Sequence, residues 1–72
     1  MSDYHINVFW SDEDQSWVAD IPDLVHCSAF GSTPQEALVG VLETKQAWLA
    51  SAHDHSDTIP EPRYRPAIYA IR

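Results

Sequence analysis

Residues 33–42 read TPQEALVGVL and mark the start of the longest element in the sequence. Thr33 places a hydroxyl at the N-cap, Pro34 takes the first helical position, and Glu36 stands where a capping box needs a carboxylate. Gly40 would let this helix approach a sheet closely, at some cost in helix propensity. Downstream, apolar residues recur at helical spacing and predict a helix that ends near 52 or 53: Ala37, Leu38, Val41, Leu42, Trp48, Leu49 and Ala52.

The segments before this helix alternate as β-strands do. In the first of them Trp10 lies on one face and Phe9 on the other, so both faces carry aromatic side chains. Pro22 ends the second strand because it offers no ladder donor, and Gly31 closes the third. The predicted elements are a strand at 4–10, a polar hairpin loop at 11–16, a strand at 17–21 and a strand near 26–30.

After the helix the chain reads as a polar linker at 53–58 and a Pro-rich connector at 59–66, where prolines exclude a helix. Residues 67–71 are short and partly apolar, which predicts a final edge strand. The fold class is therefore α+β, in the order βββαβ, with an antiparallel sheet and one long helix packed on one face. We expect residues 1–72 to form a single domain.

The charge balance is acidic: 11 Asp and Glu against 4 Lys and Arg give a formal net charge of −7. Three of the basic residues, Arg63, Arg65 and Arg72, stand in the C-terminal stretch. Nucleic-acid-binding domains usually have the opposite balance, because neutralising phosphates supplies much of their affinity. We therefore expect no direct binding to nucleic acid and an attraction to basic proteins.

Compartment and assembly follow from other features of the composition. Cys27 is the single cysteine, so no disulfide framework exists, and we expect it to be a small buried apolar residue in a reducing compartment. No apolar run approaches the ~20 residues of a membrane helix, and the N-terminus lacks the pattern of a signal peptide. We expect a cytoplasmic protein without membrane contact. A thin core rich in aromatics favours a homo-oligomer, most simply a dimer.

Several motifs together resemble the core of HicB-like antitoxins. Residues 17–24 read WVADIPDL, and Cys27 follows at the family's spacing. Gly-Ser-Thr at 31–33 and Glu-Ala-Leu at 36–38 complete the pattern. The resemblance covers roughly residues 4–49, and the motifs are moderately specific in combination.

The resemblance implies a βββαβ fold like a truncated RNase H domain, and the role of binding and neutralising HicA, a small basic mRNA-cleaving toxin. Most members also carry a C-terminal DNA-binding segment; the sequence ends at Arg72 without one, so we expect a single-domain member that does not repress through DNA. At Val25-His26 the family commonly has Pro-Gly, and we expect the turn to take another shape. The alternative to an antitoxin is an orphan oligomeric binding or structural module without a toxin partner.

Clusters of polar residues have plain structural explanations. The acidic run at 12–14 suits a solvated loop better than an octahedral magnesium site. Asp20 and Asp23 raise the question of a nuclease, but HicB-like proteins resemble the RNase H fold without its active site; we expect Asp23 to cap the turn after Pro22. His53-Asp54-His55, with Asp57, suits a helix terminus better than a zinc site. We expect no enzymatic activity, no metal and no cofactor.

We therefore expect the function of the protein to depend on surfaces that bind a partner. One helix can cover only one face of a sheet, so the aromatic residues on the other face and near the hairpin should be exposed or buried in a contact. Acidic side chains would complement a basic partner. The predicted partner-binding residues are Phe9, Trp10, Asp12, Glu13, Asp14, Trp17, Asp20 and Asp23.

Overall fold

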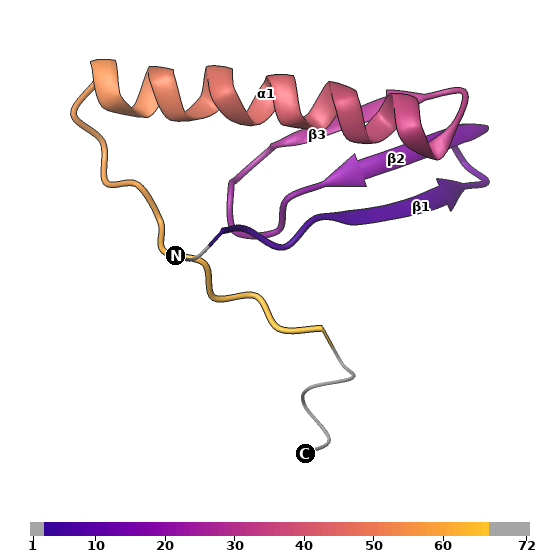
Figure 1. Ribbon diagram of the computed structural model, residues 1–72, viewed down its shortest axis with the longest axis horizontal. Helices are drawn as coiled ribbons and strands as arrows, with labels where there is room; N and C mark the ends of the chain where they lie inside the picture. The colour runs from indigo at the N-terminus through magenta and orange to yellow at the C-terminus, as the bar shows by residue number, and fades with distance from the viewer. Residues whose placement is uncertain (1–2, 67–72) are drawn as a thin grey trace.

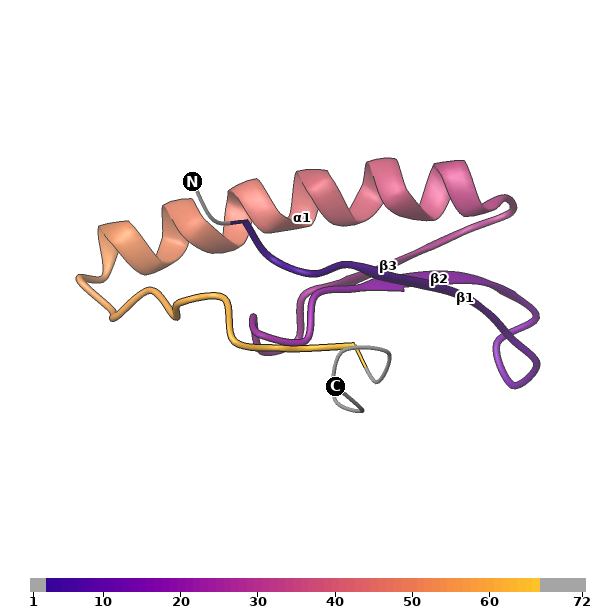
Figure 2. The same ribbon diagram turned by 60° about the horizontal axis from the view of Figure 1, so that its bottom comes forward.

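The computed structural model describes residues 3–66. In that part of the chain three strands precede one helix: β1 (Asn7–Ser11), β2 (Ser16–Asp20), β3 (Ser28–Gly31) and α1 (Pro34–Asp54). The helix lies along one face of the antiparallel sheet (Figures 1 and 2). The predicted α+β class, the βββα order and the single long helix on one face are confirmed. The predicted final strand at 67–71 lies outside the described residues.

The sheet is a meander in the order β1-β2-β3. Val8, Ala19 and Ala29 stand side by side on the face that α1 covers, whereas Phe9, Val18 and Phe30 stand side by side on the other face, because neighbouring positions in a strand point to opposite faces. The predicted first strand began at residue 4, but β1 begins at Asn7. Asn7 pairs with the last residue of β2, so the residues before it have no ladder partner.

The turn between β2 and β3 explains why the third strand begins later than predicted. The amide of Ile21 donates to the carbonyl of Cys27 at 3.0 Å, and the amide of Cys27 donates to the carbonyl of Leu24 at 3.1 Å, so residues 21–27 form a closed loop. His26 has φ 60°, the left-handed conformation that glycine favours. His26 therefore carries a side chain at a position whose backbone conformation favours glycine.

The helix start is confirmed, with one change of partner. Thr33 Oγ1 accepts from the amide of Glu36 at 3.1 Å, as a capping box requires. The Glu36 carboxylate, however, accepts from the amide of Ser32 at 2.7 Å rather than from Thr33. Gly40 lies close to the sheet, as expected, since an added Cβ would come within 3.0 Å of Ala29 Cβ. Within residues 3–66 no helix combines the length and apolar character needed to span a bilayer.

The core lies between α1 and the helix-facing side of the sheet. Cys27 is 2% exposed, which confirms its prediction as a buried apolar residue. The helix packs mainly against β2 and β3 and less against β1. As a result Leu38 and Leu42, two residues of the predicted apolar stripe, remain 37% and 40% exposed. The core cluster consists of Ala19, Ile21, Leu24, Cys27, Ala37 and Val41.

The Pro-rich connector leaves the end of α1 and lies against the same domain, below the end of the sheet (Figure 2). The hydroxyl of Tyr4 donates to the carbonyl of Pro60. The ring of Tyr64 packs on the ring of His5, with centroids 4.7 Å apart. The described part of the connector is therefore extended chain, held against the domain by contacts at Pro60 and Tyr64.

Candidate protein-binding surface

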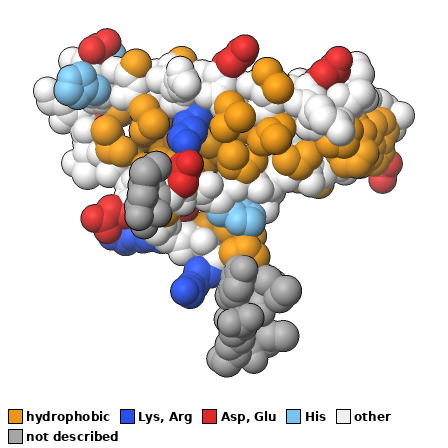
Figure 3. All heavy atoms as spheres, viewed as in Figure 1, with side chains coloured by type: hydrophobic (Ala, Val, Ile, Leu, Met, Phe, Trp, Pro, Cys, Tyr) orange, Lys and Arg blue, Asp and Glu red, His pale blue; other side chains and the backbone are white. Residues whose placement is uncertain are grey.

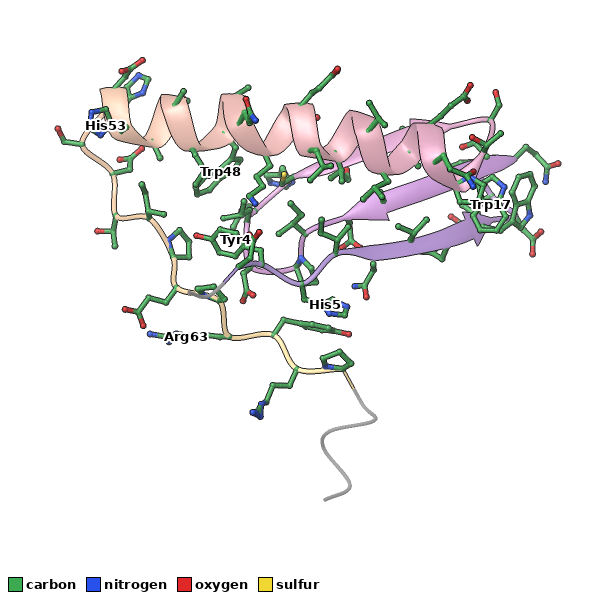
Figure 4. The ribbon with its side chains drawn as sticks, viewed as in Figure 1. Tyr4, His5, Trp17, Trp48, His53 and Arg63 are labelled. Atoms are coloured by element: carbon green, nitrogen blue, oxygen red, sulfur yellow. The ribbon has the colours of Figure 1, made fainter. Side chains whose placement is uncertain are left out.

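The β1–β2 hairpin carries a tryptophan pair close to its tip. Trp10 and Trp17 are direct cross-strand partners, and their rings meet edge to face with centroids 5.9 Å apart. Such pairs are stable because the positive edge of one ring meets the negative face of the other. Trp10 is 45% exposed and Trp17 is half-buried against the core (Figure 4). The pair therefore gives the hairpin a rigid aromatic surface of the kind that anchors protein contacts.

The acidic loop at 12–14 is organised around this pair. The indole N–H of Trp10 donates to the Asp12 carboxylate at 2.9 Å, and the hydroxyl of Ser11 donates to the Asp14 carboxylate at 2.9 Å. The side-chain amide of Gln15 donates to the carbonyl of Asp12 at 2.6 Å, and Gln15 itself adopts φ 52°. The Asp12 carboxylate is thus held beside the exposed indole of Trp10, the Asp14 carboxylate is held by Ser11, and Glu13 between them is exposed. We call the residues Trp10, Asp12, Glu13, Asp14 and Trp17 the hairpin tip.

The sheet face opposite α1 carries two further predicted residues. Phe9 is 47% exposed and flanks Val18, which it helps to bury to 7%. Asp20 lies on the same face at the other end of β2. Phe30 flanks Val18 from the opposite side and is 60% exposed. Sequence reasoning did not include Phe30 among the site residues, although it alternates with Ala29 in the predicted third strand. We call this side of the sheet, which carries Phe9, Val18, Asp20 and Phe30, the open face.

Asp23 stands apart from the hairpin tip, at the opposite end of β2. Its carboxylate accepts hydrogen bonds from the backbone amides of Arg63, at 3.1 Å, and Tyr64, at 3.0 and 3.2 Å. The expectation that Asp23 caps the turn after Pro22 is therefore wrong, because its oxygens point to the connector. The structure brings five of the predicted residues together at the hairpin tip, places Phe9 and Asp20 on the open face, and gives Asp23 an intramolecular partner.

The charges near the hairpin tip are not neutralised by basic side chains in the described part of the chain. In the part of the chain that the structure describes, an ion pair joins Lys45 to Asp3, with Nζ and Oδ1 2.7 Å apart. The ammonium group of Lys45 also lies over the ring of Tyr4. The hydrogen bond from Lys45 lowers the pKa of Asp3. Arg63 belongs to the connector, far from the hairpin (Figure 4). The hairpin tip therefore presents carboxylates that a basic partner can reach.

In residues 3–66 the side chains that could bind a metal ion are separated, and the Cys27 thiol is buried. Within residues 3–66 no three His, Cys, Asp or Glu side chains are arranged to hold a metal ion. At the helix end, His55 Nδ1 lies 2.8 Å from the carbonyl of Ser51, so that imidazole contacts the helix backbone. Burial raises the pKa of the Cys27 thiol, which disfavours the nucleophilic thiolate. The exposed aromatic and acidic surfaces therefore dominate what the described residues offer to a partner.

Comparison with known proteins gives the family of this small α+β domain: the chain belongs to the UPF0150 family. It is 34% identical over 53 residues to UPF0150 protein Ta0767 of Thermoplasma acidophilum, a match that covers 74% of this chain and 77% of that relative. No family model matches the chain, and no solved structure matches it significantly.

Proposed function

We propose that this protein is a HicB-like antitoxin module that binds a small basic HicA-type mRNA-cleaving toxin and covers its RNA-binding surface. The observation that carries the proposal is the hairpin tip, where exposed Trp10 donates to the Asp12 carboxylate and two more exposed acidic residues follow in the same loop. The ion pair found within residues 3–66 lies elsewhere, between Lys45 and Asp3. The net charge of −7 supports a basic partner. The HicB-like motifs and membership of the UPF0150 family are compatible with this role.

The mechanism of neutralisation would be steric and electrostatic. The carboxylates of the hairpin tip accelerate encounter with a basic surface, and the tryptophan pair contributes the apolar contact that slows dissociation. Phe9 and Asp20 extend the contact onto the open face. Asp23 contributes indirectly, because it holds the connector in place. No catalysis by this chain is needed, and we place the protein in the cytoplasm, where the Cys27 thiol stays reduced.

Affinity purification of the tagged chain from its native cells, followed by mass spectrometry and an RNA-cleavage assay, tests the proposal. We expect a stoichiometric small basic protein to be retained, and we expect its RNA cleavage to stop when the purified chain is added back. Recovery of the chain alone as a stable oligomer would instead support an orphan oligomeric binding or structural module. A retained partner that still cleaves RNA in the complex would contradict neutralisation.

Association kinetics with that partner test the role of the hairpin tip. Glu13→Lys should slow association by roughly threefold or more at low salt and reduce its salt dependence, because attraction to the partner is lost. Glu43→Lys is the matched control: Glu43 is also exposed and the charge change is identical, but it lies on α1. Equal association rates for the two variants would show that the acidic loop does not face the partner.

A further inference from the structure

The indole of Trp10 has a ring face available, although its N–H group is already bonded. The N–H donates to the Asp12 carboxylate at 2.9 Å, so the indole offers no further hydrogen-bond donor. Trp17 meets the ring edge to face, with an interplanar angle of 71°, and this geometry leaves at least one face of Trp10 without contact from Trp17. Trp10 is 45% exposed. The part of Trp10 that a partner can contact is therefore the π surface of its ring.

Acidic side chains stand beside this ring in the same short loop. Asp12 is bonded to the indole itself, and Asp14 accepts from the hydroxyl of Ser11 at 2.9 Å. Glu13 lies between them, and all three acidic residues are exposed. A carboxylate accepts about four hydrogen bonds, so Asp12 and Asp14 keep free acceptor sites. Figure 3 shows hydrophobic surface at the hairpin end of the molecule, with an acidic side chain at its border, whereas the basic side chains visible in this view lie elsewhere. The hairpin tip thus combines a π surface with acceptors for a cation.

A flat, weakly hydrated cation fits this combination best. A guanidinium group stacks on an aromatic face through cation–π attraction, and at the same time it donates parallel hydrogen bonds to a carboxylate. A lysine ammonium is compact and strongly hydrated, so it loses more hydration when it approaches an indole. A neutral apolar side chain would desolvate the carboxylates without replacing their hydrogen bonds. The chemistry of the hairpin tip therefore selects arginine among the side chains of a basic protein.

We propose that the hairpin tip receives an arginine side chain of the basic partner, with the guanidinium group stacked on Trp10 and bonded to the carboxylates of the loop. This inference rests on the proposed function for the partner, and it adds the side chain that the partner must present. Trp10 determines specificity because it distinguishes arginine from lysine, whereas the acidic residues attract either cation. Trp17 is a positioning residue: its ring contact and the bond to Asp12 fix the Trp10 indole before the partner arrives.

Nuclear magnetic resonance of the isotope-labelled full chain tests the proposal with two peptide probes of equal charge, tetra-arginine and tetra-lysine. We expect tetra-arginine to bind about threefold or more tightly than tetra-lysine. The indole N–H signal of Trp10 should shift on binding. Trp48 supplies an internal control, because its indole N–H is also bonded, to the carbonyl of Val25 at 2.9 Å, but it lies on α1. The Trp48 signal should stay in place.

Variants at the hairpin tip separate stacking from charge. Trp10→Leu keeps an apolar side chain without a π surface and should remove the preference for tetra-arginine, whereas Trp10→Tyr should retain most of that preference. Glu13→Gln should weaken the binding of both peptides by the same factor, because it removes a charge and leaves the ring. Thermal unfolding identifies any variant that fails to fold, and the comparison of the two peptides on the wild type requires no variant.

Equal affinity of the wild type for the two peptides would overturn the proposal, as would a preference for tetra-arginine that survives in Trp10→Leu. A shift of the Trp48 signal in place of the Trp10 signal would assign arginine to another site and would also overturn it. These measurements do not use a toxin. A toxin that is retained and inhibited while the hairpin tip shows no preference for arginine would refute this inference alone, whereas a clear preference with no retained toxin would refute the proposed function alone.

Discussion

The carboxylate of Asp23 holds the backbone amide of Tyr64, with its two oxygens 3.0 and 3.2 Å from that nitrogen, although 41 residues separate the two positions. Charge-assisted bonds of this kind are stronger than those between neutral groups. The Asp23 residue belongs to the Pro-Asp-Leu part of the HicB-like motif, so in this chain a motif residue positions the connector. The ring of Tyr64 then packs on His5, just before β1.

Removal of this carboxylate should release the connector. The chain has few trypsin sites, and the bond after Arg63 lies at the two amides that Asp23 binds. In Asp23→Ala we expect cleavage after Arg63 to be roughly tenfold faster than in the wild type, because cleavage follows the population of the opened segment. Glu61→Ala is the control, since it removes a connector carboxylate that makes no hydrogen bond to another residue within 3–66. Equal cleavage rates in all three proteins would show that Asp23 does not hold the segment.

His26→Gly should stabilise the protein. His26 has φ 60°, which costs a side-chain-bearing residue about 1–2 kcal/mol and costs glycine nothing sterically. After the greater chain entropy of glycine is subtracted, we expect a gain of about 1 kcal/mol, or roughly 4–8 °C in Tm. The neighbouring Val25→Gly is the control and should destabilise, because Val25 does not adopt a positive φ. A lower Tm for His26→Gly would mean that contacts of the imidazole outweigh the backbone term.

Gly31→Ala should destabilise the protein by about 2–3 kcal/mol. An added Cβ would come within 2.5 Å of the amide nitrogen of Ala37 and 2.7 Å of Glu36 Cβ, so the first turn of α1 would have to move. Urea unfolding measures the loss. Gly40→Ala provides the comparison: its Cβ would meet Ala29 Cβ at 3.0 Å, and helix propensity offsets part of that strain. A smaller loss at Gly31 than at Gly40 would contradict this account of the β3–α1 connection.

Cys27 should be unreactive in the folded protein and should make stability fall at alkaline pH. Burial raises its pKa above the ordinary 9.0. The stability that the buried, protonated Cys27 thiol contributes is therefore fully present below the unfolded-state pKa. This stability is lost as pH rises through the folded-state pKa. Thiol modification should proceed at the rate of global unfolding, and Cys27→Ala should abolish this part of the alkaline loss while lowering stability at neutral pH. Rapid modification under native conditions would show that the loop at 21–27 opens locally.

Local patterns were enough to predict most of the secondary structure. The capping residues Thr33 and Pro34 set the start of α1, and the alternation in the segments that contain Trp10 and Trp17 predicted the hairpin, because these features depend on neighbours in the chain or directly across one tight turn. The pairing of Trp10 with Trp17 was not predicted, because it depends on the register of the two strands. The acidic loop between the strands followed from the same alternation. The burial of Cys27 followed from the small apolar character of its side chain.

Features that depend on contacts between distant parts of the chain could not be predicted from local sequence patterns. The lateral displacement of α1, which exposes Leu38 and Leu42, depends on how helix and sheet surfaces fit, and periodicity alone contains no such information. The bonds from Asp23 to the connector require the path of the whole intervening chain. Strand patterns likewise specify which residues alternate, but not the order in which the described strands lie side by side in the sheet.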